Sequence, residues 1–166
     1  MVHPLVDQLR YTRSEWVRGF EGVSPEDALR RIEPMNSIGW LVGHLAWHEQ
    51  LYWLQRAQGI TLVPEVEACA AGQPASTPPI DDMWTAWHTI TAAADEYLNN
   101  LTTDLLVTHY IVNGEPHRES VGTFLYHLIY HYWYHLGEAQ AIRQQLGHSD
   151  LPHYLGPIWE TPYCPE

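Results

Sequence analysis

The sequence predicts an all-α protein, a four-helix bundle with long connections between its helices. Four long stretches carry apolar residues at helical spacing, and Gly, Pro, Ser or Asn residues mark their ends. Strand-like stretches do not alternate with these helices, which argues against a parallel α/β fold. The chain has 166 residues, of which 45% are hydrophobic. This size and composition predict a single domain that spans residues 1–166.

Local signals place each predicted helix. Serines, which favour the N-cap position, precede three of them: Ser24, Ser37 and Ser120. Glycines, which favour the position just after a helix, follow three of them: Gly22, Gly59 and Gly147. We therefore expect long helices at residues 5–20, 38–58, 81–101 and 121–147, and a short helix at 24–31. The helix at 38–58 is apolar over most of its circumference, so it is expected to be well buried.

The segments between and after the helices are rich in turn residues. Residues 60–79 contain four prolines and are expected to form a long surface connection. Residues 102–119 contain strand-like residues around Asn113-Gly114, a turn signal, so a short extended excursion is expected near 105–115. The Pro-rich C-terminal tail is expected to pack across the bundle, because its aromatic side chains would otherwise be exposed. These aromatic residues are Tyr154, Trp159 and Tyr163.

The composition excludes several function classes. Eight Lys and Arg against 20 Asp and Glu give a formal net charge of −12. Binding to phosphates needs basic side chains, so neither nucleic acid nor an anionic membrane surface is an expected partner. The chain has no apolar leader and no run of 18 apolar residues, which predicts a cytoplasmic protein. Cys69 and Cys164 lie far apart and form no disulfide framework, which fits a reducing compartment.

Histidines recur at steps of four in two of the apolar helices. His127, His131 and His135 follow one another in the last helix, and His44 and His48 lie in the helix at 38–58. Residues four apart lie one turn above each other on one face, so neighbouring imidazoles can bind one metal ion. We expect His131 and His135 to bind the ion together with His44 from the facing helix. Three imidazoles leave coordination positions open, as in catalytic sites.

Other interpretations of the histidines stay open at this point. Buried histidines can be hydrogen-bonded core residues, and one HxxxH pattern is by itself weak evidence for a metal. A carboxylate-bridged di-iron bundle needs Glu-x-x-His motifs, which the predicted long helices lack. A haem held by two histidines is compatible with the spacing, although a pair four residues apart favours one small ion.

Two acids and several aromatic residues lie near the histidines in sequence. Glu138 follows His135 by three residues and is the candidate catalytic residue, either as a general base or as a partner that orients an imidazole. Glu49 is expected on a solvated helix face. The neighbouring aromatic residues are expected to fill the core or line a pocket: Trp40, Trp47, Tyr52, Tyr130 and Tyr134.

The sequence SIGWLVGHLA at 37–46 and the sequence HYWYHLGE at 131–138 resemble the motifs of the DinB-like superfamily of metal-binding four-helix bundles. Their order and spacing match over about residues 5–147. The resemblance implies three metal ligands, at His44, His131 and His135. It leaves His48 and His127 as neighbours of the ligands. The superfamily often has Arg-Gly-Gln after the last ligand, where this chain has Leu-Gly-Glu.

The resemblance also implies a chemistry. The superfamily includes transferases and isomerases that use mycothiol or bacillithiol. It implies a divalent metal (zinc or nickel, with iron also compatible) and a low-molecular-weight thiol that binds the metal through sulfur. A bound thiol loses its proton readily and attacks an electrophile. Transfer of such a thiol to a small-molecule substrate is therefore the expected function, and hydrolysis by metal-bound water is the second enzymatic interpretation.

The alternative is a non-catalytic, stress-associated helical bundle that binds a metal or another ligand without converting it. Turnover of an electrophile in the presence of a thiol would support the enzyme over the non-catalytic protein. In either case a homodimer is the expected assembly, because two-fold dimers are the commonest oligomers.

Overall fold

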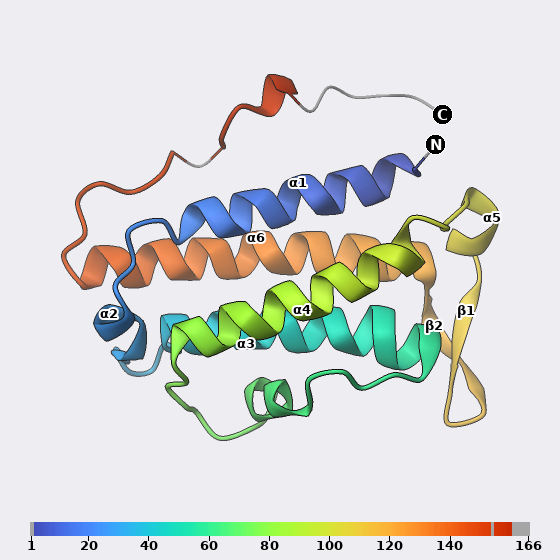
Figure 1. The fold of residues 1–166 in the computed structure, drawn as a ribbon, viewed down its shortest axis with the longest axis horizontal. Helices are drawn as coiled ribbons and strands as arrows, with labels where there is room; N and C mark the ends of the chain where they lie inside the picture. Colours follow the sequence, from blue (N-terminus) through green and yellow to red (C-terminus); the bar gives the residue numbers. More distant parts are fainter. Residues whose placement is uncertain (1, 154, 161–166) are drawn as a thin grey trace.

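The computed structural model describes residues 2–153 and 155–160, and this part of the chain is mostly helical with a small two-stranded sheet. The long helices are α1 (Pro4–Gly19), α3 (Ile38–Glu49), α4 (Ile80–Leu98) and α6 (Val121–Gln145). They lie alongside one another, with α1 next to α6 and α4 next to α3 (Figure 1). The predicted all-α character is thus confirmed in outline.

The long helices contact one another, and the connections between them set their directions. Helix α3 packs against both α4 and α6, and Arg13 of α1 forms an ion pair with Asp95 of α4 at 2.8 Å. Helices α3 and α4 run in the same direction, so residues 57–79 return along the length of α3 before α4 begins (Figure 1). Helices α3 and α6 run in opposite directions. This antiparallel pairing decides which side chains of the two helices meet.

The predicted serine N-caps are present. The hydroxyl oxygen of Ser37 accepts a hydrogen bond from the backbone N–H of Trp40 at 3.2 Å, and Ser120 binds the N–H of Thr123 in the same way. Ser24 caps the short helix α2 (Pro25–Leu29), which ends two residues earlier than expected. Each cap satisfies an N–H group that the first turn of a helix leaves free.

The helix expected at 38–58 does not stay α-helical. It changes at η1 (Gln50–Arg56) into a π-helix, and the chain then turns at Gly59, whose φ is +72°. Here the side chain of Gln50 binds the backbone of the returning connection, accepting from the N–H of Val63 at 2.7 Å and donating to its carbonyl oxygen at 3.0 Å. Helical periodicity alone does not distinguish an α-turn from a π-turn.

The connection at 60–79 is also less superficial than expected. It contains the 3₁₀-helix η2 (Pro64–Cys69), in which Val66 and Cys69 are buried against α3. The glycine at position 43 permits this contact, because a Cβ there would lie 2.6 Å from Sγ of Cys69. The prediction that residues 60–79 form a surface connection was therefore wrong for Val66 and Cys69.

The extended excursion is confirmed as a hairpin. After the short helix α5 (Thr103–Leu106), strands β1 (His109–Val112) and β2 (Glu115–Ser120) pair antiparallel. Asn113 and Gly114 both have positive φ, as a tight hairpin turn requires. The hairpin lies at the end of the molecule where α4 ends and α6 begins (Figure 1).

The tail runs back along α1, as its hydrogen bonds show. Arg18 donates to the carbonyl oxygen of His153 at 2.6 Å, and Glu15 accepts from the N–H of Gly156 at 2.9 Å. Trp159, in the 3₁₀-helix η3 (Ile158–Glu160), is nevertheless 77% exposed, so the expectation that the tail covers its aromatic residues was wrong for this one. Tyr154 and Tyr163 lie outside the described residues. Within the described ranges, no helix has the length and apolar character needed to cross a membrane.

Candidate metal centre

Four histidines meet between the antiparallel helices α3 and α6. His44 and His48 lie one turn apart on α3, and His131 and His135 lie one turn apart on α6. The ring centroids of His48 and His131 are 4.3 Å apart, and His44 lies 5.1 Å from His131 and 5.0 Å from His135. Ligand nitrogens of His44, His48 and His131 all lie within 4.8 Å of one another. The HxxxH spacing thus brings imidazoles from both helices to one place.

Hydrogen bonds fix the tautomers of two of these imidazoles. Nδ1 of His44 donates to the carbonyl oxygen of Cys69 at 2.7 Å, and Nδ1 of His135 donates to a carboxylate oxygen of Glu138 at 2.8 Å. A neutral imidazole that carries its proton on Nδ1 has a lone pair on Nε2. Such outer hydrogen bonds are typical of histidines that bind metals, because they orient the ring and increase its basicity.

The contact between His131 and His135 is short and direct. Their Nε2 atoms are 2.8 Å apart, and Nδ1 of His131 is buried without a hydrogen-bond partner among the described residues. Two nitrogens that bind zinc at about 2.0–2.1 Å in a tetrahedral site lie roughly 3.3 Å apart. A shift of about half an ångström would therefore let both rings bind one ion. The residues present fit a divalent metal.

Burial keeps these imidazoles neutral. It lowers the pKa of His44 to about 4 and the pKa of His131 to about 3, and it lowers the pKa of His48 further. Neighbouring histidines lower the pKa further at all three, whereas the hydrogen bond to the Cys69 carbonyl opposes this shift at His44. At neutral pH all three therefore present lone pairs, which is the form that binds metals.

Glu138 and His127 lie at the edges of the cluster. The hydrogen bond from His135 lowers the pKa of Glu138, so its carboxyl group is ionised near neutral pH. His127 lies one turn before His131, with ring centroids 5.9 Å apart, and its side chain is 43% exposed. Its Nδ1 lies 3.4 Å from the hydroxyl of Tyr52.

Aromatic residues of α3 and η1 surround the histidines, whereas on α6 the largely exposed Tyr134 contacts its neighbour His135 with ring centroids 5.0 Å apart. Trp40 stacks on His44 with ring centroids 4.4 Å apart, and Tyr52 contacts the edge of the His48 ring. Tyr130 and Tyr134 are 66% and 72% exposed, so their expected place in a core or pocket was wrong. They occupy the outer face of α6, since each lies one residue before a clustered histidine.

The expectation that Glu49 lies on a solvated helix face was wrong, because this residue is fully buried. Its carboxylate accepts two hydrogen bonds from Arg13, at 2.7 and 2.6 Å, and one from the hydroxyl of Tyr132 at 2.7 Å. That hydroxyl in turn accepts from Nε1 of Trp87 at 2.7 Å, and Arg13 also binds Asp95. We name these five residues the buried clasp, in which Asp95, with a side chain that is 40% exposed, forms the outer end. It joins α1, α3, α4 and α6 directly beside the histidines.

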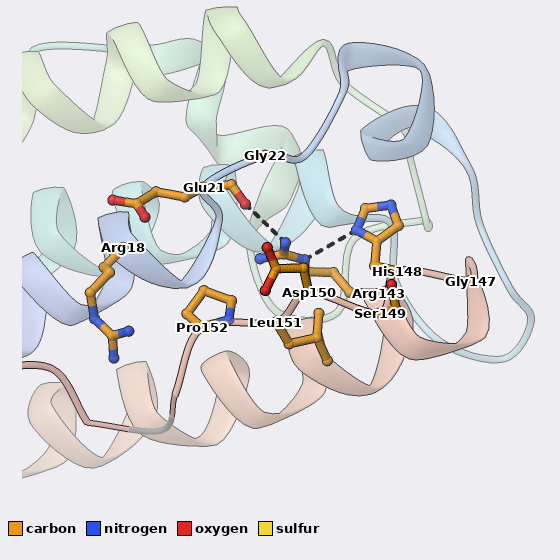
Figure 2. A pocket seen from close by; sticks show the side chains of 10 residues that line it. All are labelled: Arg18, Glu21, Gly22, Arg143, Gly147, His148, Ser149, Asp150, Leu151 and Pro152. Atoms are coloured by element: carbon orange, nitrogen blue, oxygen red, sulfur yellow. Dashed lines mark hydrogen bonds between the residues drawn. The ribbon is translucent and has the colours of Figure 1, made fainter.

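Two cavities lie between α1, α6 and the tail that follows α6. The first has a volume of about 620 Å³, and Figure 2 shows its lining from Arg18 to Pro152. The buried guanidinium of Arg143 donates to the carbonyl oxygens of Gly19 and Glu21 there, which satisfies the end of α1. The second, of about 170 Å³, is lined by residues of α6 around Gly137, by the end of α1 and by the tail at Pro152 and His153. Neither cavity is lined by a histidine of the cluster.

The fold and this site together define a helical protein with a buried cluster of neutral histidines that is suited to a divalent metal. The sequence model of the Mycothiol-S-transferase family matches residues 4–147, from the start of α1 to just beyond α6. The chain therefore belongs to this family, and the resemblance to the DinB-like superfamily is confirmed. The search of curated proteins gives no match to the chain.

Proposed function

We propose that this protein binds a divalent metal through its clustered histidines and transfers a low-molecular-weight thiol, mycothiol first among them, to an electrophilic small molecule. The observation that carries the proposal is the cluster itself. Neutral imidazoles from two facing helices direct their nitrogens at one another in a chain of the Mycothiol-S-transferase family. A buried group of this kind is costly unless hydrogen bonds or a metal satisfy it.

In this proposal His44, His131 and His135 hold the ion, and zinc or nickel suits a set of imidazoles. A bound divalent ion supplies a Lewis acid that lowers the pKa of a thiol. Glu138 holds the Nδ1 proton of His135 and so keeps its Nε2 lone pair turned inward. The lowered pKa of Glu138 supports this orienting role over that of a general base.

The reaction needs no oxidant or reductant. The thiol releases its proton to solvent, its sulfur forms a bond to an electrophilic carbon, and the leaving group departs with the bonding electron pair. Trp47, which is only partly buried and contacts both His44 and His48, provides apolar surface for the substrate beside the cluster. The proposal also includes the finer fold, a four-helix bundle formed by the long helices, and a homodimer as the assembly.

One observation favours a second candidate, a non-catalytic metal-binding protein. Neither of the two cavities described above is lined by a histidine of the cluster. A protein that stores or senses a metal needs the cluster but no adjoining substrate cavity.

The test begins with the metal content of freshly purified protein from which any affinity tag has been removed. About one zinc or nickel per chain is expected, and a chelator should remove it. Transfer assays then compare mycothiol, bacillithiol and glutathione with a panel of electrophiles, and His131→Ala should abolish turnover. Metal binding without turnover across the panel would support the second candidate. Protein that neither contains nor takes up metal would refute both.

A further inference from the structure

The antiparallel packing of α3 and α6 places five imidazoles in an alternating row. Going along the helices, His127 is followed by His48, His131, His44 and His135, and neighbours in this row have ring centroids 4.3–6.1 Å apart. We name this arrangement the imidazole row. His48 lies between its exposed end, at His127, and the residues that match the superfamily motif. The motif itself assigns no role to His48.

His48 is buried, and one of its two ring nitrogens lacks a hydrogen bond within the described part of the chain. It is 8% exposed, and its Nδ1 is buried with no hydrogen-bond partner among the described residues. Its neighbours are the rings of Trp47 and Tyr52 on one side and the imidazoles of His44 and His131 on the other. A neutral imidazole has one donor and one acceptor, and leaving either unpaired in an apolar environment destabilises the protein.

A ring nitrogen of His48 lies close to ring nitrogens of other clustered histidines. His48 belongs to the group whose ligand atoms lie within 4.8 Å of one another, together with His44 and His131. His135 adjoins the same two residues from the other end of the row, with its Nε2 2.8 Å from Nε2 of His131. His44 and His131 are therefore common to two sets of three imidazoles.

We infer that His48 is a further metal ligand, so that the centre is formed by four imidazoles, two from α3 and two from α6. This inference rests on the proposed function, since it assumes that the cluster binds a metal. Four nitrogen ligands still leave two positions free on a six-coordinate ion, whereas they fill a tetrahedral one. The centre therefore favours an ion that accepts six ligands, such as nickel, cobalt or iron, over four-coordinate zinc.

The experiment compares His48→Gln and His48→Phe with wild type and with His127→Gln as the matched control. His127 is also a histidine of the row, but it is 43% exposed and lies 3.4 Å from the hydroxyl of Tyr52. Circular dichroism establishes folding. Nickel and cobalt affinities are measured by calorimetry, and the absorption spectrum of the cobalt form and the nitrogen hyperfine pattern of the copper form report the ligands.

Loss of His48 is expected to weaken metal binding by more than the roughly 10–100-fold typical of losing an outer hydrogen-bond partner. It should also remove one nitrogen from the spectra, whereas His127→Gln should change neither. The metal-free His48→Phe protein should melt no lower than metal-free wild type, because an unsatisfied imidazole has been replaced by an apolar ring.

Unchanged affinity and spectra in both His48 variants would overturn the inference while leaving the three-ligand site intact. A lower melting temperature of metal-free His48→Phe, with metal affinity retained, would also overturn it and assign His48 to the core. Wild-type protein that binds no metal would instead refute the proposed function, so the two failures are distinguishable.

Discussion

Replacing Tyr132 by Phe tests the energetic importance of the buried clasp. The substitution removes one oxygen atom and keeps the ring, so the packing of α6 should be retained. In the native protein this hydroxyl donates to Glu49 at 2.7 Å and accepts from Nε1 of Trp87 at 2.7 Å. Tyr132 is 1% exposed and Glu49 is fully buried, so water cannot replace the lost bonds without rearrangement of the protein.

The expected cost follows from the two groups that lose a partner. The N–H of Trp87 is left without an acceptor, which costs about 1–3 kcal/mol for a buried donor. The carboxylate of Glu49 keeps its two bonds from Arg13 and loses one charge-assisted bond. Together these losses should lower the free energy of unfolding by about 2–4 kcal/mol. For a chain of this length, that corresponds to a fall in melting temperature of roughly 4–16 °C.

Denaturation in urea measures this free energy, with a chelator present so that metal binding does not contribute to stability. Tyr130→Phe is the matched control, because that tyrosine lies on the same helix but is 66% exposed, and its change should stay within about 0.5 kcal/mol. A double-mutant cycle with Trp87→Phe should give a coupling energy above about 0.5 kcal/mol. If Tyr132→Phe were no more destabilising than the control, the clasp would not contribute to stability as argued.

Three further predictions concern the histidines and the connection that contacts them. The pKa values of His44 and His131 are lowered from 6.5 to about 4 and 3. As the pH falls, these imidazoles therefore bind protons in the unfolded chain before they do so in the folded protein. The metal-free protein should therefore lose stability as the pH falls from about 6.5 towards 4, by up to about 1.4 kcal/mol per pH unit for each imidazole. In His44→Asn, the free energy of unfolding measured by urea titration should fall less steeply with decreasing pH. An equally steep fall would contradict the inference that burial keeps His44 neutral. Glu138→Gln should weaken metal binding about 10–100-fold in calorimetry, because the amide no longer supplies a charged acceptor to His135; unchanged affinity would show that this hydrogen bond does not orient the ring. Burial raises the pKa of Cys69 to about 11, so at pH 8 iodoacetamide should modify this thiol only as fast as the protein unfolds. Mass spectrometry of a variant without the C-terminal cysteine measures that rate, and rapid labelling of folded protein would contradict the buried position.

The sequence predicts well those features that depend on neighbours in the chain. Ser37 and Ser120 begin helices because each hydroxyl reaches an N–H three residues later. Asn113-Gly114 forms the hairpin turn because both residues tolerate positive φ. The HxxxH pairs share a helix face by geometry alone, which is why the clustering of His44 with His131 could be anticipated from spacing.

Features that depend on distant partners could not be predicted in this way. An acid such as Glu49, within an apolar helix, has no local signal that distinguishes a solvated position from a buried one. Its partners Arg13 and Tyr132 come from 36 residues before it and 83 residues after it. The acceptor for His44 is a backbone carbonyl, at Cys69, which any residue type would provide. No pattern of side chains in the sequence points to such a contact.

The two sets of buried polar groups in this protein have different requirements. Within the clasp, Glu49 and Tyr132 have hydrogen-bond partners from the chain itself, so the protein needs nothing else to stabilise them. In the imidazole row, buried nitrogens of His48 and His131 have no such partner among the described residues. Since the clasp links the same helices one residue away from these histidines, it can hold α3 and α6 in register while the row is unsatisfied. A scaffold that is stable by itself, beside nitrogens that the chain does not satisfy, is what a reversible metal site requires.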